Sequence, residues 1–238
     1  CISKRIRYCG KAAHACAPEK GVNALHAANL GLMALGFAKD LFAEGEFIRV
    51  HPIITKGGDS VNVVPDEVLL ETYVRGRSLD TILYTNEIVD RAFMGAAFSV
   101  GAEVEIKDTP GFMPLRVDDD FTNLGRKVME ELVDTTDIFE STHSSGCTDM
   151  GDLSTLMPVL QAKLGGVQGT LHGSDYQVVN PEVTIIGAEF LAYTAMELLA
   201  NGGAEAKRIV ENYEPLFKSK DEYFEMQDSL FATKAFSK

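Results

Sequence analysis

The strongest constraint on the fold is the order in which strand and helix patterns follow one another in the first 107 residues. Apolar residues alternate with polar ones in the predicted strands and recur every three to four residues in the predicted helices. The predicted elements in chain order are strand 2–8, helix 21–44, strand 47–55, strand 68–77, helix 79–99 and strand 103–107. This order predicts a ferredoxin-like βαββαβ unit, in which two helices cover one face of an antiparallel sheet.

Lys4 is an exception to the alternation in the first strand, because it falls on the apolar side. A four-stranded sheet also has open edges that need cover, so we expect the unit to dimerise through an edge strand and the first helix. Gly31 and Gly36 lie inside that helix, where each costs about 1 kcal/mol relative to Ala. We expect them to allow a partner element to approach closely.

A Pro- and Gly-rich segment at 109–114 separates this unit from the rest of the chain. We therefore divide the chain into two domains, 1–112 and 113–238. The predicted elements of the second domain are helix 118–133, strand 159–164, helix 182–201, helix 204–212 and helix 221–231. The tail beyond the last helix is expected to fray.

Charge and cysteine content argue against several classes of function. The chain has 22 Lys and Arg against 35 Asp and Glu, a net charge of −13, and no basic cluster, which argues against a nucleic-acid partner. No apolar run approaches the roughly 20 residues of a membrane span, and no signal-peptide pattern is present. The four Cys show neither zinc-ribbon spacing nor the density of a disulfide framework, so we expect a cytoplasmic protein without a membrane partner.

His14 lies in the segment 10–21, between the first predicted strand and the first predicted helix. It is flanked by the small residues Ala12, Ala13 and Ala15. A ligand can approach a histidine closely on such a loop. The segment alone leaves open whether His14 has a function or is a solvated loop histidine.

Asn62 and Arg75 form a second candidate group. Asn62 lies in the segment 57–67, just before Pro65, and Arg75 lies on the strand that follows. An Asn and an Arg on neighbouring strands can together bind a carboxylate. The alternative is a strand-end Asn and a solvated Arg.

Two later loops also carry candidate residues. The segment 144–152 is too polar and too Gly-rich for a core element, and such loops present backbone N–H groups to an anion or a carbonyl group. Thr148 or Asp149 could equally cap a helix there. His172 follows a Gly-Thr-Leu run in another loop, and a lone His is weak evidence for a metal ligand.

Together these segments resemble the di-zinc aminoacylase and amidohydrolase family of metallopeptidases, which includes aminobenzoyl-glutamate, hippurate and indoleacetyl-amino-acid hydrolases. The resemblance rests on GKAAHACAPEKGVNAL, GGDSVNVVPDE with YVRGRS, SGCTDMGDLS and LHGSDYQVVNPE, in the family order. It implies a ferredoxin-like lid that dimerises, followed by the C-terminal half of an α/β catalytic domain. The implied reaction is hydrolysis of an amide bond in an N-acyl amino acid or a small peptide.

The resemblance also implies roles for single residues. His14 matches a lid histidine that reaches the scissile carbonyl in the partner's active site and stabilises the oxyanion. Asn62 and Arg75 match lid residues that bind the substrate, with Arg75 at its carboxylate. His172 matches the last metal ligand. The residues that match the loop lining the substrate pocket are Ser145, Gly146, Thr148 and Asp149.

The implied cofactor is a pair of divalent metal ions, zinc first, with manganese or cobalt as alternatives. The family's other metal ligands and its general-base Glu lie before the lid, where this chain has no residues, and His172 alone cannot hold a metal pair. The chain also starts with Cys rather than Met. We therefore expect a fragment of a longer protein that binds no stoichiometric metal and is inactive alone. The alternative is a non-catalytic dimerisation or ligand-binding module, but such a module has no use for all four matched residues together.

Overall fold

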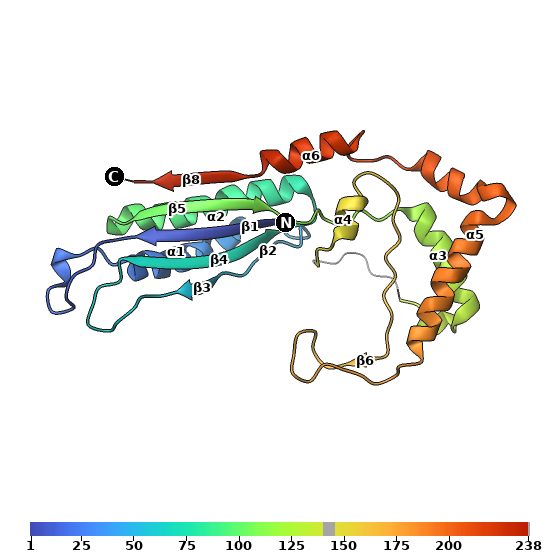
Figure 1. Ribbon diagram of the computed structural model, residues 1–238, viewed down its shortest axis with the longest axis horizontal. Coiled ribbons are helices and arrows are strands. Elements are labelled where there is room, and N and C mark those ends of the chain that lie inside the picture. Colours follow the sequence, from blue (N-terminus) through green and yellow to red (C-terminus); the bar gives the residue numbers. More distant parts are fainter. Residues whose placement is uncertain (140–145, 238) are drawn as a thin grey trace. The chain divides into compact units, whose positions relative to one another are not determined.

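The computed structural model describes residues 1–139 and 146–237, which divide into two compact units (Figure 1). Unit 1 contains residues 1–114, 146–149 and 219–237, and unit 2 contains residues 115–139 and 150–218. Unit 1 thus includes the predicted 1–112 domain and adds residues from the C-terminal end, while the domain boundary itself stays a prediction. The antiparallel sheet with its helices confirms the predicted fold class.

Unit 1 is built on a six-stranded antiparallel sheet (Figure 1). The strands lie in the order β2-β4-β1-β5-β8, and β3 also pairs with β4. Their bounds are β1 (Ile2–Cys9), β2 (Arg49–Val50), β3 (Ile53–Lys56), β4 (Glu67–Arg75), β5 (Glu103–Pro110) and β8 (Ala232–Phe236). The predicted strand 47–55 is divided into β2 and β3 around Pro52, because a proline cannot donate to the ladder.

Side-chain alternation gives the sheet two different faces. Ile2, Ile6 and Tyr8 of β1 are buried on the side covered by the helices, together with Val68 and Leu70 of β4. Residues of the opposite parity lie on the other side, which we call the open face. The predicted division of both strands into an apolar and a polar side is confirmed.

Two helices cover the buried face of the sheet. They are α1 (Ala24–Ala38) and α2 (Leu79–Val100). α1 begins later than the predicted residue 21 because Asn23 caps it, accepting hydrogen bonds from the backbone N–H groups of Leu25 and His26. It also ends earlier than predicted and continues as a single 3₁₀ turn, Lys39–Leu41.

Gly31 of α1 is explained by packing inside unit 1. A Cβ atom at this position would lie 2.5 Å from Tyr8 Oη and 2.7 Å from the ring of Phe93, so only glycine fits. Tyr8 Oη in turn donates to Phe93 O at 2.9 Å. The close approach expected for Gly31 is therefore made to β1 and α2 rather than to a partner molecule. A Cβ at Gly36 would meet nothing within 4 Å.

The C-terminal tail is a strand of the sheet, so the prediction that it frays was wrong. α6 (Lys220–Ser229) agrees with the predicted helix 221–231, and β8 then pairs with β5 in antiparallel register. Local sequence does not show that the far edge of β5 is available for pairing. β8 covers that edge and leaves β2 and β3 at the other edge of the described sheet.

On the helix-covered side, Lys4 is fully buried in a cluster of charges. Its Nζ lies 2.6 Å from Asp90 Oδ1 in an ion pair, and it donates to Asp108 Oδ1 at 2.5 Å and to Asn86 Oδ1 at 2.7 Å. Lys234 of β8 forms ion pairs with the same two carboxylates. Two cations and two anions therefore balance within this buried charge cluster, which explains a lysine on the apolar side of β1.

Unit 2 consists mainly of helices. Its regular elements are α3 (Asp119–Leu132), α4 (Asp149–Leu153, from Met150 on), α5 (Val183–Asn212), β6 (Val167–Gln168) and β7 (Gln177–Val178). α3 packs on α5, and Arg208 Nη1 lies 2.8 Å from Asp120 Oδ1 between them. The predicted strand 159–164 was wrong, because this segment pairs with no other strand in the described part of the chain.

α5 contains the two predicted helices 182–201 and 204–212, separated by a break. Residues 200–203 have non-helical backbone angles, and Asn201, Gly202 and Gly203 have positive φ. By length and composition, α5 is the single helix among the described residues that could cross a membrane. A single helix of this kind is weak evidence for a membrane span, and the expected absence of a long apolar run has to be corrected to this extent.

Candidate active site

The His14 loop, residues 10–22, connects β1 to α1 and is held against the segment that precedes β4. Ala15 N–H donates to Asn62 O at 2.9 Å. His14 itself is bridged to Val63 in an antiparallel pairing. The structure therefore brings the two candidate residues His14 and Asn62 together at one end of the sheet.

Two glycines allow the arms of the His14 loop to close. A Cβ at Gly10 would lie 2.1 Å from Val22 O, and a Cβ at Gly21 would lie 2.7 Å from Lys11 O. Both contacts are with backbone, which cannot move aside without opening the loop. Glycine at these two positions thus keeps the two arms of the loop together and so determines the position of His14 on it.

The side chain of His14 is exposed, and a backbone group of its own loop orients the ring. Cys16 N–H donates to His14 Nδ1 at 3.2 Å. Because Nδ1 accepts this hydrogen bond, we assign the proton of the neutral imidazole to Nε2. His14 therefore presents an N–H donor, which is the group that stabilises an oxyanion.

Asn62 and Arg75 are not close to each other within one chain. Asn62 precedes β4, and its Oδ1 accepts a hydrogen bond from Ser60 Oγ, whereas Arg75 is the last residue of β4. A strand rises about 3.4 Å per residue, so the two ends of β4 lie about 27 Å apart. The prediction that Asn62 and Arg75 grip one carboxylate was therefore wrong for residues of the same chain.

Arg75 lies on the open face at the far end of β4 from His14. Its guanidinium lies over the ring of Tyr73, with Cζ 5.2 Å from the ring centroid. This cation–π contact holds the guanidinium in place. Arg75 forms no ion pair with a carboxylate in residues 1–139 and 146–237.

At the end of the sheet near His14, the carboxylate of Glu67 is shared by two cations. Lys56 Nζ lies 3.0 Å from Glu67 Oε2, and Arg7 Nε lies 2.7 Å from Glu67 Oε1. Hydrogen bonds from Lys56 and then Arg7 lower the pKa of Glu67 below its usual value. Glu67 thus stays ionised and pairs with both Lys56 and Arg7.

The proposed pocket-lining loop is described only in part. Ser145 lies outside the described residues. Gly146 and Thr148 precede α4, and Asp149 is its first residue. Their roles toward a substrate stay predictions.

His172 lies in the turn between β6 and β7, in unit 2. It is exposed and has φ of 66°, a left-handed conformation that is uncommon for a residue other than glycine. The turn is closed by Gly173 N–H donating to Thr170 O at 2.7 Å and by Thr170 N–H donating to Asp175 Oδ1 at 3.3 Å. The side chain is accessible, and its role as a metal ligand stays a prediction.

The described residues do not by themselves form a metal centre. No group of three or more His, Cys, Asp or Glu side chains gathers as a metal site in the part of the chain that the structure describes. A two-metal site needs several ligands. A metal pair would therefore need ligands in addition to those that the described residues gather.

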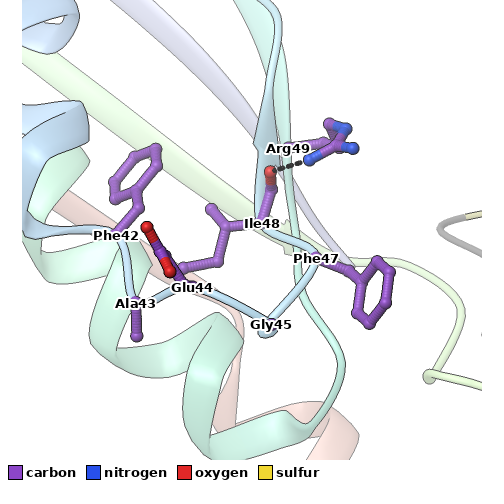
Figure 2. A pocket seen from close by; sticks show the side chains of 7 residues that line it. All are labelled: Phe42, Ala43, Glu44, Gly45, Phe47, Ile48 and Arg49. Carbon is purple, nitrogen blue, oxygen red and sulfur yellow. Dashed lines mark hydrogen bonds between the residues drawn. The ribbon is translucent and has the colours of Figure 1, made fainter.

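A shallow pocket of about 300 Å³ lies between α1 and β2 (Figure 2). It is lined by Phe42, Ala43, Glu44, Gly45, Phe47, Ile48 and Arg49. None of the predicted site residues borders it. Figure 2 shows the guanidinium of Arg49 turned to its own chain, where Nη1 donates to Ile48 O at 2.8 Å. No polar groups converge in this pocket, so we do not interpret it as a binding site.

Comparison with known proteins agrees with this architecture. Residues 2–92 match the family model described as a peptidase dimerisation domain. The chain is 31% identical over 206 residues to the Xaa-Arg dipeptidase of Mus musculus, covering 82% of this chain and 47% of that protein. It is 30% identical over 159 residues to the Xaa-Arg dipeptidase of Homo sapiens, covering 64% and 36%. The chain thus spans less than half the length of these relatives.

Solved structures show the same fold. The aminopeptidase PepT of Bacillus cereus superposes with a TM-score of 0.62 at 21% identity, covering 84% of this chain and 52% of that chain. A dinuclear metal-binding peptidase of the M20 family from Bacillus subtilis superposes with a TM-score of 0.56 at 19% identity, covering 83% and 49%.

The sheet with its two covering helices and the presented His14 define a dimerisation domain of the kind found in metallopeptidases. Residues 2–92 belong to the peptidase dimerisation domain family, and the two curated relatives support the metallopeptidase and amidohydrolase family for the chain. This confirms the family indicated by the four sequence motifs.

Proposed function

We propose that the protein is a metal-dependent hydrolase that cleaves an amide bond in an N-acyl amino acid or a small peptide, with His14 as the donor to the oxyanion. The relatives named Xaa-Arg dipeptidases and the neighbour named a dinuclear metal-binding peptidase support a hydrolase that uses divalent metals, with zinc, manganese or cobalt as candidates. The observation that carries the role of His14 is the hydrogen bond from Cys16 N–H to its Nδ1, which leaves Nε2–H free to donate.

The separation of His14 from Arg75 supports a composite active site. A dipeptide extends only about 7 Å, because an extended chain rises at most about 3.6 Å per residue. It cannot touch both ends of β4, which lie about 27 Å apart. If both residues act on a substrate, His14 serves one active site and Arg75 serves another, so the two roles are divided between the subunits of a dimer.

The proposed homodimer interface lies at the β3 edge. β8 covers β5, so β2 and β3 form the other edge of the described sheet, and Ile53 and Ile54 of β3 are exposed there. On α1, which packs over β1 and β4, an exposed apolar stripe runs along the helix and the turn that follows it. Its members are Met33, Phe37 and Leu41, at i, i+4 and i+8. In the dimer, pairing of the two β3 edge strands and packing of the two α1 stripes would cover the edge of the sheet opposite β8.

The test is subunit complementation in the full-length protein. His14→Ala should lower kcat by about 10²–10³, the usual cost of removing one oxyanion donor. His172→Ala should abolish activity by removing a metal ligand. After subunit exchange, a mixed dimer has one site with intact metal ligands and an intact His14 from the partner, so activity should return to about one good site per mixed dimer.

His26→Ala is the matched control, because His26 is exposed on α1 and its side chain has no hydrogen-bond partner within the described residues. It should keep full activity. If verified exchange of the His14 and His172 variants restores nothing, action of His14 across the dimer is ruled out. If His14→Ala retains normal kcat, the role as oxyanion donor is ruled out as well.

A further inference from the structure

Arg49 and Arg75 stand directly opposite each other on the open face of the sheet. They are register partners in the antiparallel pairing of β2 with β4. The next pair in the same ladder is Val50 with Val74, and both valines are buried against the helices. Because adjacent pairs alternate between the two faces, both arginines lie on the open face, with Cβ atoms about 5 Å apart.

This pair differs from the other cations on the open face and its adjoining edge. Each of the others has a carboxylate partner close to it. The pairs are Arg5 with Glu71 at 3.9 Å, Arg7 with Glu67 at 2.7 Å, Lys56 with Glu67 at 3.0 Å and Lys107 with Glu105 at 3.4 Å. Within the described residues, neither Arg49 nor Arg75 forms an ion pair, although the chain carries 35 acidic residues against 22 basic ones.

Both guanidinium groups are held locally and keep free donors. Arg75 stacks on Tyr73, and Arg49 uses one N–H to bond Ile48 O. A guanidinium has five N–H donors in a fixed fork, so most of the donors of the pair remain available to a ligand. Like charges directly opposite each other in a sheet are destabilising, which makes an uncompensated pair a poor structural choice.

We propose that Arg49 and Arg75 together bind the amino-acid part of the substrate, and that this part carries two carboxylates, as in an N-acyl or N-peptidyl aspartate or glutamate. This inference rests on the proposed hydrolase function and adds Arg49 as a specificity-determining residue. Two adjacent guanidinium groups can each form a bidentate bond with one carboxylate. The same two charges repel a cationic side chain, so an arginine or lysine at this position is disfavoured.

The test measures binding rather than turnover, on the chain printed above. N-acetyl-L-glutamate and the nearly isosteric N-acetyl-L-glutamine are titrated against the protein, with the backbone amide signals of residues 49 and 73–75 as the NMR reporters. The dicarboxylate should bind at least about tenfold more tightly than the monocarboxylate, since one bidentate ion pair is lost in the latter. N-acetyl-L-arginine should bind more weakly than both.

Arg49→Gln should remove the preference for glutamate over glutamine, and Arg75→Gln should weaken both ligands. Arg5→Gln is the matched control, because it removes the same charge from the same face at a residue that already has a carboxylate partner. It should keep the preference within about twofold. Amide spectra of the free variants verify that each one is folded.

Equal affinity for glutamate and glutamine, no binding of either, or an unchanged preference in Arg49→Gln would each overturn the proposal. None of these results bears on amide hydrolysis or on His14, which are tested by the complementation experiment. Conversely, loss of the proposed hydrolase function would leave a measured dicarboxylate preference intact as a binding property.

Discussion

The two faces of the sheet in unit 1 differ in whether their cationic side chains are matched by carboxylates. On the helix-covered face, Lys4 and Lys234 are matched by Asp90 and Asp108, so the buried charge cluster is balanced. On the open face, the arginine pair formed by residues 49 and 75 has no carboxylate partner in the described chain. A buried charge must be neutralised because desolvation costs several kcal/mol, whereas water screens an exposed one. The open face can therefore keep unpaired cations for a ligand, and the buried face cannot.

The largest effect is expected from breaking the balance on the buried face. Lys4→Met leaves Asp90 and Asp108 with only Lys234, and thus a net negative charge in a buried site. Removing one partner of a buried ion pair typically costs about 3–5 kcal/mol. The free energy of unfolding from urea denaturation should fall by this amount.

Lys107→Met serves as its control, since Lys107 is exposed on β5 and lies 3.4 Å from Glu105. It should change the unfolding free energy by no more than about 0.5 kcal/mol. A Lys4→Met variant within about 1 kcal/mol of the wild type would show that the cluster is not buried in solution as the structure has it.

Most of unit 1 could be predicted from the sequence because its signals are local. Alternation in β1 and β4 and the apolar stripes of α1 and α2 determine the elements and their buried sides. The buried charge cluster was not predicted, since it joins four segments far apart in the chain. Two signals pointed to it: Lys4 on the apolar side of β1, and Asp90 within the apolar stripe of α2. The strand β8 was missed for the same reason, because its place is set by β5 and by Lys234.

A smaller effect on the same face is expected from Lys234→Met. Lys234 joins the cluster from the edge strand, and its side chain is 37% exposed. Water screens part of its interaction, so we expect a loss of about 1–2 kcal/mol rather than the full cost of a buried pair. Hydrogen exchange should show opening of the β5–β8 pairing before the rest of the sheet.

The pH dependence of this variant has a defined sign. Burial lowers the pKa of Lys234, but the contacts with Asp90 and Asp108 outweigh it and raise the pKa above its usual value of 10.5. A group whose folded pKa is raised contributes stability that is complete below pH 10.5 and is lost as the pH rises through the folded pKa. The stability difference between wild type and Lys234→Met should therefore be constant from neutral pH to about pH 10 and shrink above it. A difference that grows with alkaline pH would contradict the ion pairs.

The site residues were predicted less completely than the fold. The small residues around His14 indicated a presented histidine, and the structure adds the hydrogen bond from Cys16 that orients its ring. The distance between Asn62 and Arg75 could have been predicted, because Asn62 precedes the predicted strand 68–77 and Arg75 lies near its far end, but the prediction of a shared carboxylate did not take this length into account. Arg49 carried no signal of its own, since its importance comes only from its register opposite Arg75.

The smallest effect on stability, and the sharpest test of the comparison, is expected from Arg49→Glu. This change converts an unfavourable cross-strand pair into an opposite-charge pair with Arg75 and should stabilise the sheet by about 0.2–1 kcal/mol. Its gain should fall in high salt, because both side chains are accessible to solvent. Arg7→Glu is the mirror control, because it places the introduced carboxylate directly opposite that of Glu105, with the uncharged Leu69 on its other side, and should destabilise the sheet by at least a similar amount. If Arg49→Glu is neutral or destabilising in low salt, the two arginines do not repel each other. The claim that the open face carries an unfavourable charge pair, unlike the balanced buried face, would then be wrong.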